Sequence, residues 1–322
     1  MLFRTNSPAI RFTGRWDITE KCAVTTAPGG VIEIGYYGKM AVLHFDVATN
    51  RTPFPHLWVA VDDGAKVEVP LAQFLRVEAK EEGNHVVKIT FKGAVEMHHR
   101  WYPPLIGKVS FCGFEADAEG QLPEDNRKTI EFIGDSITEG VLIDAEYDPK
   151  KLDQPNRVYQ DDVTATYAYL TAEAFGLKPV IMGYGAVGIT CSGQGAVPRV
   201  AEAYPYYYHG RPMESLNADY IVINHGTNDG KATAEEYLAG MEEFLCLVRS
   251  RNSQSKIAVI IPFYQRFRDE LLDFIPKFNK KYNEDIFLVD TYGWLPKEPV
   301  HPLRDGHRLA ADKLIEILKD WI

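Results

Sequence analysis

The first third of the chain consists of short segments in which apolar and polar residues alternate, separated by turn residues. Residues 85–91 alternate in this way, which is typical of a half-buried strand. The apolar segment 57–61 runs into Asp62-Asp63-Gly64, a sequence that favours a hairpin turn. No long segment with a helical period interrupts residues 9–118. The pattern predicts a β-sandwich, with further strands at 31–34, 40–45 and 108–115.

From residue 129 onward, continuous apolar segments alternate with helical ones. The helical segment 233–249 begins with Thr233-x-x-Glu236, which is the pattern of a capping box. Continuously apolar strands are buried on both faces, so this alternation predicts a parallel sheet covered by helices. The expected strands are 129–133, 179–182, 220–224, 256–261 and 286–290, and the expected helices are 164–175, 233–249, 268–282 and 307–321.

A polar, turn-rich stretch at residues 118–124 separates the two patterns. We therefore predict a β-sandwich domain over residues 1–120 and an α/β domain over residues 126–322. A chain of 322 residues is long enough for two hydrophobic cores. With 45 % apolar and 25 % charged residues, the composition is typical of a soluble globular protein.

The first predicted strand of the α/β domain ends abruptly in Gly134-Asp135-Ser136. A serine at a strand-to-turn junction is presented with free backbone N–H groups around it, as a nucleophile requires, although the same tripeptide is also common in simple turns. Three later segments also follow predicted strands. Because the carboxyl ends of parallel strands share one edge of a sheet, all four are expected to converge there. The later segments are 182–190, 225–230 and 298–302.

In this order, the segments resemble the SGNH (GDSL) hydrolases. The matching residues are Gly134-Asp135-Ser136, Gly185, Gly226-Thr227-Asn228-Asp229 and Glu298-Pro299-Val300-His301-Pro302. Upstream, Phe12-Thr13-Gly14-Arg15, Val61-Asp62-Asp63-Gly64 and Gly113-Phe114 resemble carbohydrate esterase family two. Members of that family carry a jelly-roll domain before the hydrolase domain and remove acetyl groups from xylan or mannan sugars. The resemblance implies an N-terminal jelly roll and a flavodoxin-like hydrolase domain.

The resemblance also implies a role for each matching residue. Ser136 is the expected nucleophile and His301 the base that accepts its proton. The expected oxyanion hole consists of the backbone N–H groups of Ser136 and Gly185 and the side-chain amide of Asn228. A glycine lets the acyl oxygen approach closely, and an asparagine amide donates hydrogen bonds. Asp135 and Asp229 are expected to hold loops.

The third member of the catalytic triad departs from the family pattern. The family usually has aspartate three residues before the histidine, where this chain has Glu298. Glutamate is one methylene longer, yet it serves this role in other serine hydrolases. Glu298 is therefore a candidate to orient His301. In the alternative, the His301 Nδ1–H bonds to a backbone carbonyl and the enzyme works with a dyad. Asp290 and Asp305 are weaker candidates.

Several residues are candidates for contact with a substrate. Trp294 either stacks on a sugar face or packs in the core, and His225 either contacts substrate or is structural. His98-His99 would reach the site if the two domains dock closely. Residues 141–163 form either a wall of the site or a solvated surface loop.

Charge and composition exclude several classes of function. A net charge of −10 argues against a nucleic-acid binder and against an anionic membrane surface. No segment has the roughly 18 continuous apolar residues of a membrane span, and the N-terminus lacks a signal-peptide pattern, so a cytoplasmic location is expected. The cysteines lack metal or redox spacing, and we predict reduced thiols, no metal and no cofactor. They are Cys22, Cys112, Cys191 and Cys246.

The resemblance implies a serine esterase that removes O-acetyl groups from xylan- or mannan-derived sugars or oligosaccharides through an acyl-enzyme. One alternative is a lysophospholipase or thioesterase of the GDSL type, which would need a long apolar groove. The other is a carbohydrate-binding protein with a degenerate hydrolase domain, against which the joint presence of Ser136, Gly185, Asn228 and His301 argues. The expected partner is an acetylated carbohydrate, and the oligomeric state is left open.

Overall fold

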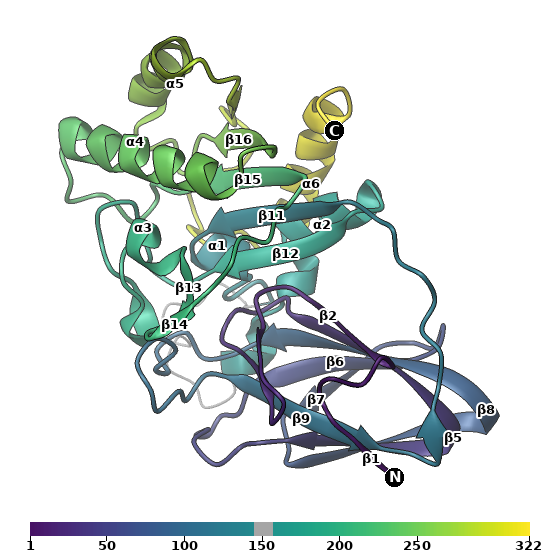
Figure 1. The fold of residues 1–322 in the computed structure, drawn as a ribbon. Helices are drawn as coiled ribbons and strands as arrows, with labels where there is room; N and C mark the ends of the chain where they lie inside the picture. Colours follow the sequence, from purple (N-terminus) through teal and green to yellow (C-terminus); the bar gives the residue numbers. More distant parts are fainter. Residues whose placement is uncertain (145–156) are drawn as a thin grey trace.

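The computed structural model describes residues 1–144 and 157–322. An antiparallel sheet region comes first in the chain and a parallel sheet with helices follows (Figure 1). The change from antiparallel to parallel strands falls between Glu119 and Thr129. This confirms the predicted α/β class with a separate β-rich N-terminal region. Of the predicted wall at 141–163, residues 145–156 lie outside the described part of the chain.

The N-terminal strands form one hydrogen-bonded antiparallel network around an apolar core that includes Ile34, Leu43 and Phe111. Its central path is β3-β4-β9-β5-β8-β6-β7, and β1, β2 and β10 pair at its sides. The jelly-roll topology stays a prediction. The strands are β1 (Leu2–Phe3), β2 (Ile10–Thr13), β3 (Asp17–Ile18), β4 (Ala23–Thr25), β5 (Val31–Phe45), β6 (His56–Val61), β7 (Val67–Pro70), β8 (Phe74–Gly93), β9 (Val109–Glu115) and β10 (Ala118–Glu119).

Two details of this region differ from the prediction. Residues 31–34 and 40–45 belong to the single strand β5, which continues through the glycine-rich stretch between them. A register shift follows Gly38, whose φ of 122° suits glycine, so the strand bends without ending. Ala118 and Glu119, assigned to the linker, pair with β5 as β10. The predicted hairpin is confirmed, since β6 and β7 pair antiparallel across the Asp62-Asp63-Gly64 turn.

The C-terminal sheet is parallel, with the strand order β12-β11-β15-β16-β17. Since β11 is first in the chain, this is the order 2-1-3-4-5 of flavodoxin-like sheets, the fold that the family resemblance implies. All five strands fall within about one residue of the predicted segments. They are β11 (Thr129–Gly134), β12 (Lys178–Gly183), β15 (Tyr220–Asn224), β16 (Lys256–Ile260) and β17 (Phe287–Val289). A small hairpin of β13 (Tyr206–Tyr208) and β14 (Arg211–Pro212) lies outside this sheet.

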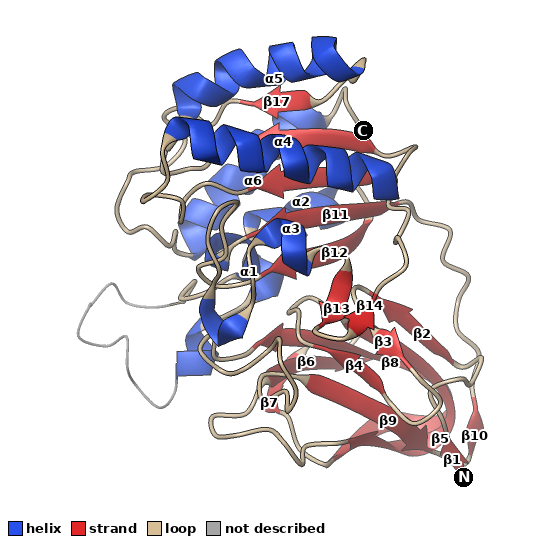
Figure 2. Cartoon of the chain, turned by 60° about the vertical axis from the view of Figure 1, so that its left-hand side comes forward, coloured by secondary structure: helices blue, strands red, loops and turns tan. Residues whose placement is uncertain are grey.

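Helices cover both faces of the parallel sheet (Figure 2). Ile133, Ile221 and Val259 pack in one core with α3, α4 and α5, whereas Phe132 and Val222 pack in the other with α2 and α6. Because both faces are buried, these strands are apolar at nearly every position. Among the described helices, none is both long and apolar enough to cross a membrane. The helices are α1 (Ser136–Glu139), α2 (Tyr167–Ala174), α3 (Val200–Ala203), α4 (Ala234–Arg251), α5 (Arg268–Tyr282) and α6 (Arg304–Leu318).

Helix boundaries follow local capping. The capping box at α4 is confirmed, because the side chains of Thr233 and Glu236 each accept from the other's backbone N–H. Helix α2 begins three residues later than predicted, after a 3-10 turn, because Thr166 caps it. Helix α6 begins at Arg304, so His307 lies inside the helix and does not open it.

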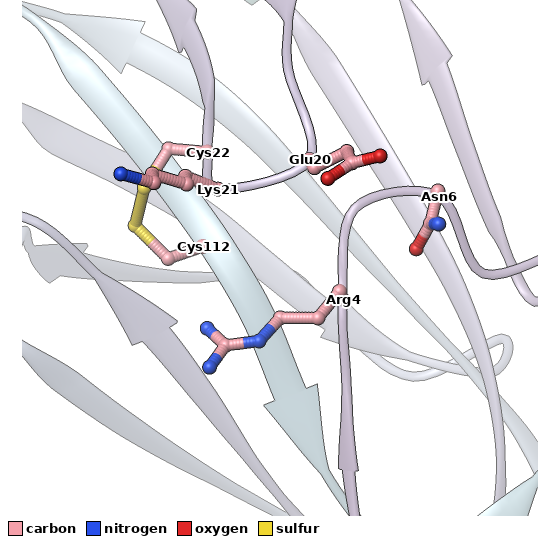
Figure 3. A pocket seen from close by; sticks show the side chains of 6 residues that line it. All are labelled: Arg4, Asn6, Glu20, Lys21, Cys22 and Cys112. Carbon is pink, nitrogen blue, oxygen red and sulfur yellow. A yellow bond between two sulfur atoms is a disulfide. The ribbon is translucent and has the colours of Figure 1, made fainter.

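The prediction of reduced thiols is wrong for one pair, since Cys22 and Cys112 form a disulfide (Figure 3). Strand β4 pairs antiparallel with β9 so that Ala23 lies opposite Phe111. Continued by one position, this register places Cys22, just before β4, opposite Cys112 in β9, at a Cα–Cα distance of 4.1 Å. The two cysteines are 90 residues apart in sequence, so their spacing alone did not reveal the pairing. The free cysteines are Cys191 and Cys246.

The two regions dock through buried polar contacts. The side chains of Arg15 and Glu131 are 2 % and 1 % exposed, and Arg15 Nη1 donates to Glu131 Oε1 over 2.8 Å. Arg15 Nη2 also donates to the carbonyl of Tyr204. At another point of the interface, Trp58 Nε1 donates to Asp162 Oδ1 over 3.1 Å. Buried charges that are paired in this way fix the relative position of the two regions.

Replacing Arg15 with methionine, which keeps most of the side-chain volume, should destabilise the protein by about 3–5 kcal/mol, because Glu131 is left buried without its cation. The midpoint of denaturant unfolding checks this value. Arg76→Met is the matched control, since its pair with Glu78 is 63 % and 57 % exposed and contributes less than about 1 kcal/mol. Equal losses in the two variants would contradict the assignment.

Candidate active site

Ser136 stands at the tight turn between β11 and α1. Gly134 makes the turn possible, because a Cβ at this position would lie 2.1 Å from Thr138 Oγ1. Asp135 caps α1, and its Oδ1 accepts from the Ile137 N–H over 2.9 Å. The turn therefore holds Ser136 at the carboxyl end of β11, as the sequence predicts.

His301 lies next to Ser136 although 165 residues separate them. It belongs to the loop between β17 and α6, and its Nε2 is 2.8 Å from Ser136 Oγ. The Ser136 hydroxyl can therefore donate directly to the imidazole. The structure brings the two expected catalytic residues together, and their chemical roles stay predictions.

The environment of His301 favours the neutral imidazole that a base must be. Burial lowers the pKa of His301 below its usual value of 6.5. The Glu96 carboxylate raises that pKa in part, and the Arg157 guanidinium lowers it further. His301 is therefore neutral at pH 7 and able to accept the Ser136 proton.

Gly185 and Asn228 follow β12 and β15, the two strands that flank β11. Asn228 Nδ2 donates to the carbonyl of Val187 over 3.1 Å and lies 3.3 Å from Asp135 Oδ2. This places the amide at the turn that carries Ser136. The N–H of Gly185 interacts with the carboxylate of Glu139 in α1 and favours its ionised form. The expected oxyanion-hole residues thus gather at the point where strand order reverses, the usual ligand site of such sheets.

Asp135 and Asp229 hold loops, as predicted. Asp229 accepts from the backbone N–H groups of Ile189 and Thr190, so it fixes the loop that follows Gly185. Burial raises the pKa of Asp135 to about 7, and the nearby Asp229 adds to this effect.

Trp294 and His225 are both in the packed interior. Trp294 belongs to the core beneath α2 and α6, with its ring centroid 6.3 Å from that of Phe263. His225 is buried edge-on to Phe244, and burial lowers its pKa to about 4. Neither ring presents an open face, so the structure favours the packing alternative over the expected substrate contact for both residues.

Glu298 is exposed at the surface, before the loop reaches His301. The Glu96 carboxylate, from the N-terminal region, raises the pKa of His301. The two weaker candidates are engaged elsewhere. Asp290 pairs with Arg268, and Asp305 accepts from the N–H of Gly306. A triad role for Glu298 stays a prediction.

The sequence did not identify the charged residues that the N-terminal region contributes to the site. The segment 94–107 reaches the site. The side chain that lies against Gly185 and raises the pKa of His301 is that of Glu96, and not that of His98 or His99. Arg100, in the same segment, is fully buried and donates to both carboxylate oxygens of Glu139. The sequence pointed to this segment through His98 and His99. Only the docking of the two regions shows that Glu96 and Arg100 are the side chains that contact the site.

No group of three or more His, Cys, Asp or Glu side chains within residues 1–144 and 157–322 is arranged to hold a metal ion.

A serine hydroxyl bonded to an imidazole, at the carboxyl edge of a flavodoxin-like sheet, is the arrangement of serine hydrolases. The chain belongs to the GDSL-like Lipase/Acylhydrolase family, whose model matches residues 132–309. No curated protein sequence matches the chain.

Solved structures share the fold over the whole length. A family two carbohydrate esterase from Cellvibrio japonicus is 18 % identical, with a TM-score of 0.80 and coverage of 99 % of this chain and 97 % of that one. An acetyl xylan esterase from Butyrivibrio proteoclasticus is 19 % identical, with a TM-score of 0.78 and coverage of 100 % and 99 %. A family two carbohydrate esterase from Clostridium thermocellum, solved with cellohexaose, is 20 % identical, with a TM-score of 0.75 and coverage of 97 % and 98 %.

Adding one methyl group at Gly185 should disable the site. The new Cβ would lie 2.2 Å from Glu96 Oε2 and 3.0 Å from Glu96 Cβ, so the loop or Glu96 must move. We expect Gly185→Ala to lower kcat/KM for 4-nitrophenyl acetate about 100-fold, the usual effect of one lost oxyanion contact. Gly83→Ala is the control, because its Cβ would meet only His85 Nε2, at 3.6 Å. Wild-type activity in Gly185→Ala would show that the geometry of this loop is not needed.

The pH dependence of activity should report the buried histidine. His301 accepts a proton only when neutral, so kcat/KM should rise with pH and level off before pH 7. Because burial lowers the pKa of His301, the midpoint of this acid limb should lie below 6.5. A kcat/KM profile from pH 4 to 9 measures it. A midpoint above 7 would mean that another group controls the reaction.

Proposed function

We propose that the protein is a carbohydrate O-acetyl esterase, acting on xylan- or mannan-derived sugars or oligosaccharides through an acyl-enzyme. The observation that carries the proposal is the 2.8 Å contact between Ser136 Oγ and His301 Nε2. Support for the sugar substrate comes from the full-length similarity to carbohydrate esterases, one of them solved with cellohexaose.

In the proposed reaction, Ser136 Oγ attacks the acetyl carbonyl carbon while His301 Nε2 takes its proton. In this proposal the oxyanion is stabilised by the N–H of Ser136 and by the Asn228 amide, and by the N–H of Gly185 once that group turns from the Glu139 carboxylate to the substrate. When the tetrahedral intermediate collapses, the sugar oxygen leaves with the proton from His301. Water then attacks the acetyl-enzyme, with His301 again as the base, and acetate is released.

The surroundings of the catalytic pair favour a short acyl group on a polar substrate. Glu96 covers Gly185 closely, which restricts the room beside the acyl carbon. Glu96 is paired with Arg157, so the nearest side chains from the N-terminal region and from the segment after residue 156 are charged. A lysophospholipase or thioesterase would instead need an apolar groove for its long acyl chain. An intact serine–histidine contact argues against a degenerate hydrolase domain.

The cytoplasmic location expected from the sequence stays a proposal. The disulfide between Cys22 and Cys112 counts against it, because reducing compartments keep most thiols reduced. Thiol labelling of the protein isolated from its native cells, with and without prior reduction, would show whether Cys22 and Cys112 are oxidised there. Reduced thiols would support the cytoplasmic location, and an intact disulfide would count against it.

An activity panel tests the function. The substrates are 4-nitrophenyl acetate, longer 4-nitrophenyl acyl esters and acetylated xylo- and manno-oligosaccharides. We expect release of acetate from the oligosaccharides and a decline in rate with acyl length. Ser136→Ala should lose at least about 10³-fold in kcat, because the nucleophile is gone.

Thermal unfolding of Ser136→Ala, expected to match the wild type, controls for misfolding. Acetate release that persists in this variant would remove Ser136 from its role. Faster turnover of long acyl esters than of acetyl sugars would favour the lipase alternative.

A further inference from the structure

The segment between β8 and β9 carries a carboxylate from the N-terminal region into the active site. Its backbone is fixed against the loop that follows β12. The N–H of Arg100 donates to the carbonyl of Gly195 over 2.9 Å. Gly195 packs so closely that a Cβ there would lie 3.1 Å from the carbonyl oxygen of Glu96. Glu96 is therefore held at a defined position beside the catalytic loop.

The carboxylate of Glu96 is held between two elements of the hydrolase domain. On one side it covers Gly185, where its Oε2 occupies the space of a Cβ. On the other side its Oε1 lies 3.2 Å from Arg157 Nη2. The two side chains are 16 % and 5 % exposed, so solvent screens their charges only weakly. A charge in such a place acts on every ionisable group nearby.

We propose that Glu96 is a positioning residue that acts through His301, by stabilising the imidazolium that forms when Ser136 gives up its proton. The inference rests on the proposed function, since that imidazolium forms during acyl transfer. The N-terminal region thereby supplies an acidic partner of the catalytic pair, from a segment about 200 residues away from His301.

The groups that bear on the protonation of His301 come from several elements. Ser136 lies on α1, Glu96 in the segment after β8, Arg157 on the 3-10 helix at Arg157–Gln160, and His307 on α6. His307 is buried and neutral at pH 7, since burial lowers its pKa to about 3. Burial favours the neutral imidazole, and of the two charged neighbours Glu96 favours the charged form of His301 whereas Arg157 opposes it.

Glu96 and Arg157 carry opposite charges, so removing each charge should shift the pKa of His301 in opposite directions. Glu96→Gln keeps the shape of the side chain and removes the negative charge, so the pKa of His301 should fall. Arg157→Gln removes the positive charge, so the same pKa should rise. Glu68→Gln is the matched control, because Glu68 is a 22 % exposed carboxylate of the same region that pairs with Lys92 and His56 and is not among the groups that shift the pKa of His301.

The experiment follows the imidazole C–H resonances of His301 by NMR from pH 4 to 8 in the full-length protein, with His301→Gln used for assignment. In parallel, kcat/KM for 4-nitrophenyl acetate is measured over the same range. We expect the His301 midpoint and the acid limb to move to lower pH in Glu96→Gln and to stay unchanged in Glu68→Gln. At the plateau, Glu96→Gln should lose about tenfold in kcat/KM, a fraction of what general base catalysis contributes.

A midpoint in folded Glu96→Gln that equals that of the wild type, or lies above it, would overturn the inference. Thermal unfolding shows whether each variant is folded. If Arg157→Gln does not fold, the titration of Glu96→Gln alone decides whether Glu96 acts on His301. The NMR titration needs no substrate, so it is independent of the proposed function. A wild type that releases no acetate defeats the proposed function, whereas an unmoved titration in an active enzyme defeats only the role of Glu96.

Discussion

The active site depends on buried ion pairs that lock the two regions together. Arg15 pairs with Glu131 on β11, the strand that leads to Ser136, and Arg100 pairs with Glu139 at the end of α1. Removing such charges from water is costly unless each finds its partner, so a different docking would leave four buried charges uncompensated. Both glutamates lie within five residues of Ser136. The same ion pairs that dock the two regions therefore also hold the elements that position Ser136.

Local patterns in the sequence were sufficient for most of the fold. The capping box at Thr233 and the apolar strands around Ser136 depend on neighbours in the chain, and both were predicted correctly. The convergence of Ser136 and His301 followed from one topological rule, that parallel strands end at a common edge. The disulfide of Cys22 depends on strand register, which a single sequence does not specify.

The charged side chains around the site could not be predicted from local sequence patterns, because they too depend on contacts between distant segments. Glu96 and Arg100 belong to an irregular segment without periodicity, and their importance arises only where that segment meets Gly185 and Glu139. Trp294 shows the opposite error, since an aromatic residue near a catalytic loop suggests a sugar platform until its burial is known. Contacts between regions therefore decide which polar side chains take part in chemistry.

The burial of Arg15 and Arg100 has a consequence for biosynthesis. Translation delivers Arg15 to the solvent 116 residues before its partner and Arg100 39 residues before its own. The carboxylates that pair with these two guanidinium groups lie on β11 and α1. The N-terminal surface can therefore be buried without loss only after both elements have been synthesised, because an unpaired buried charge is costly.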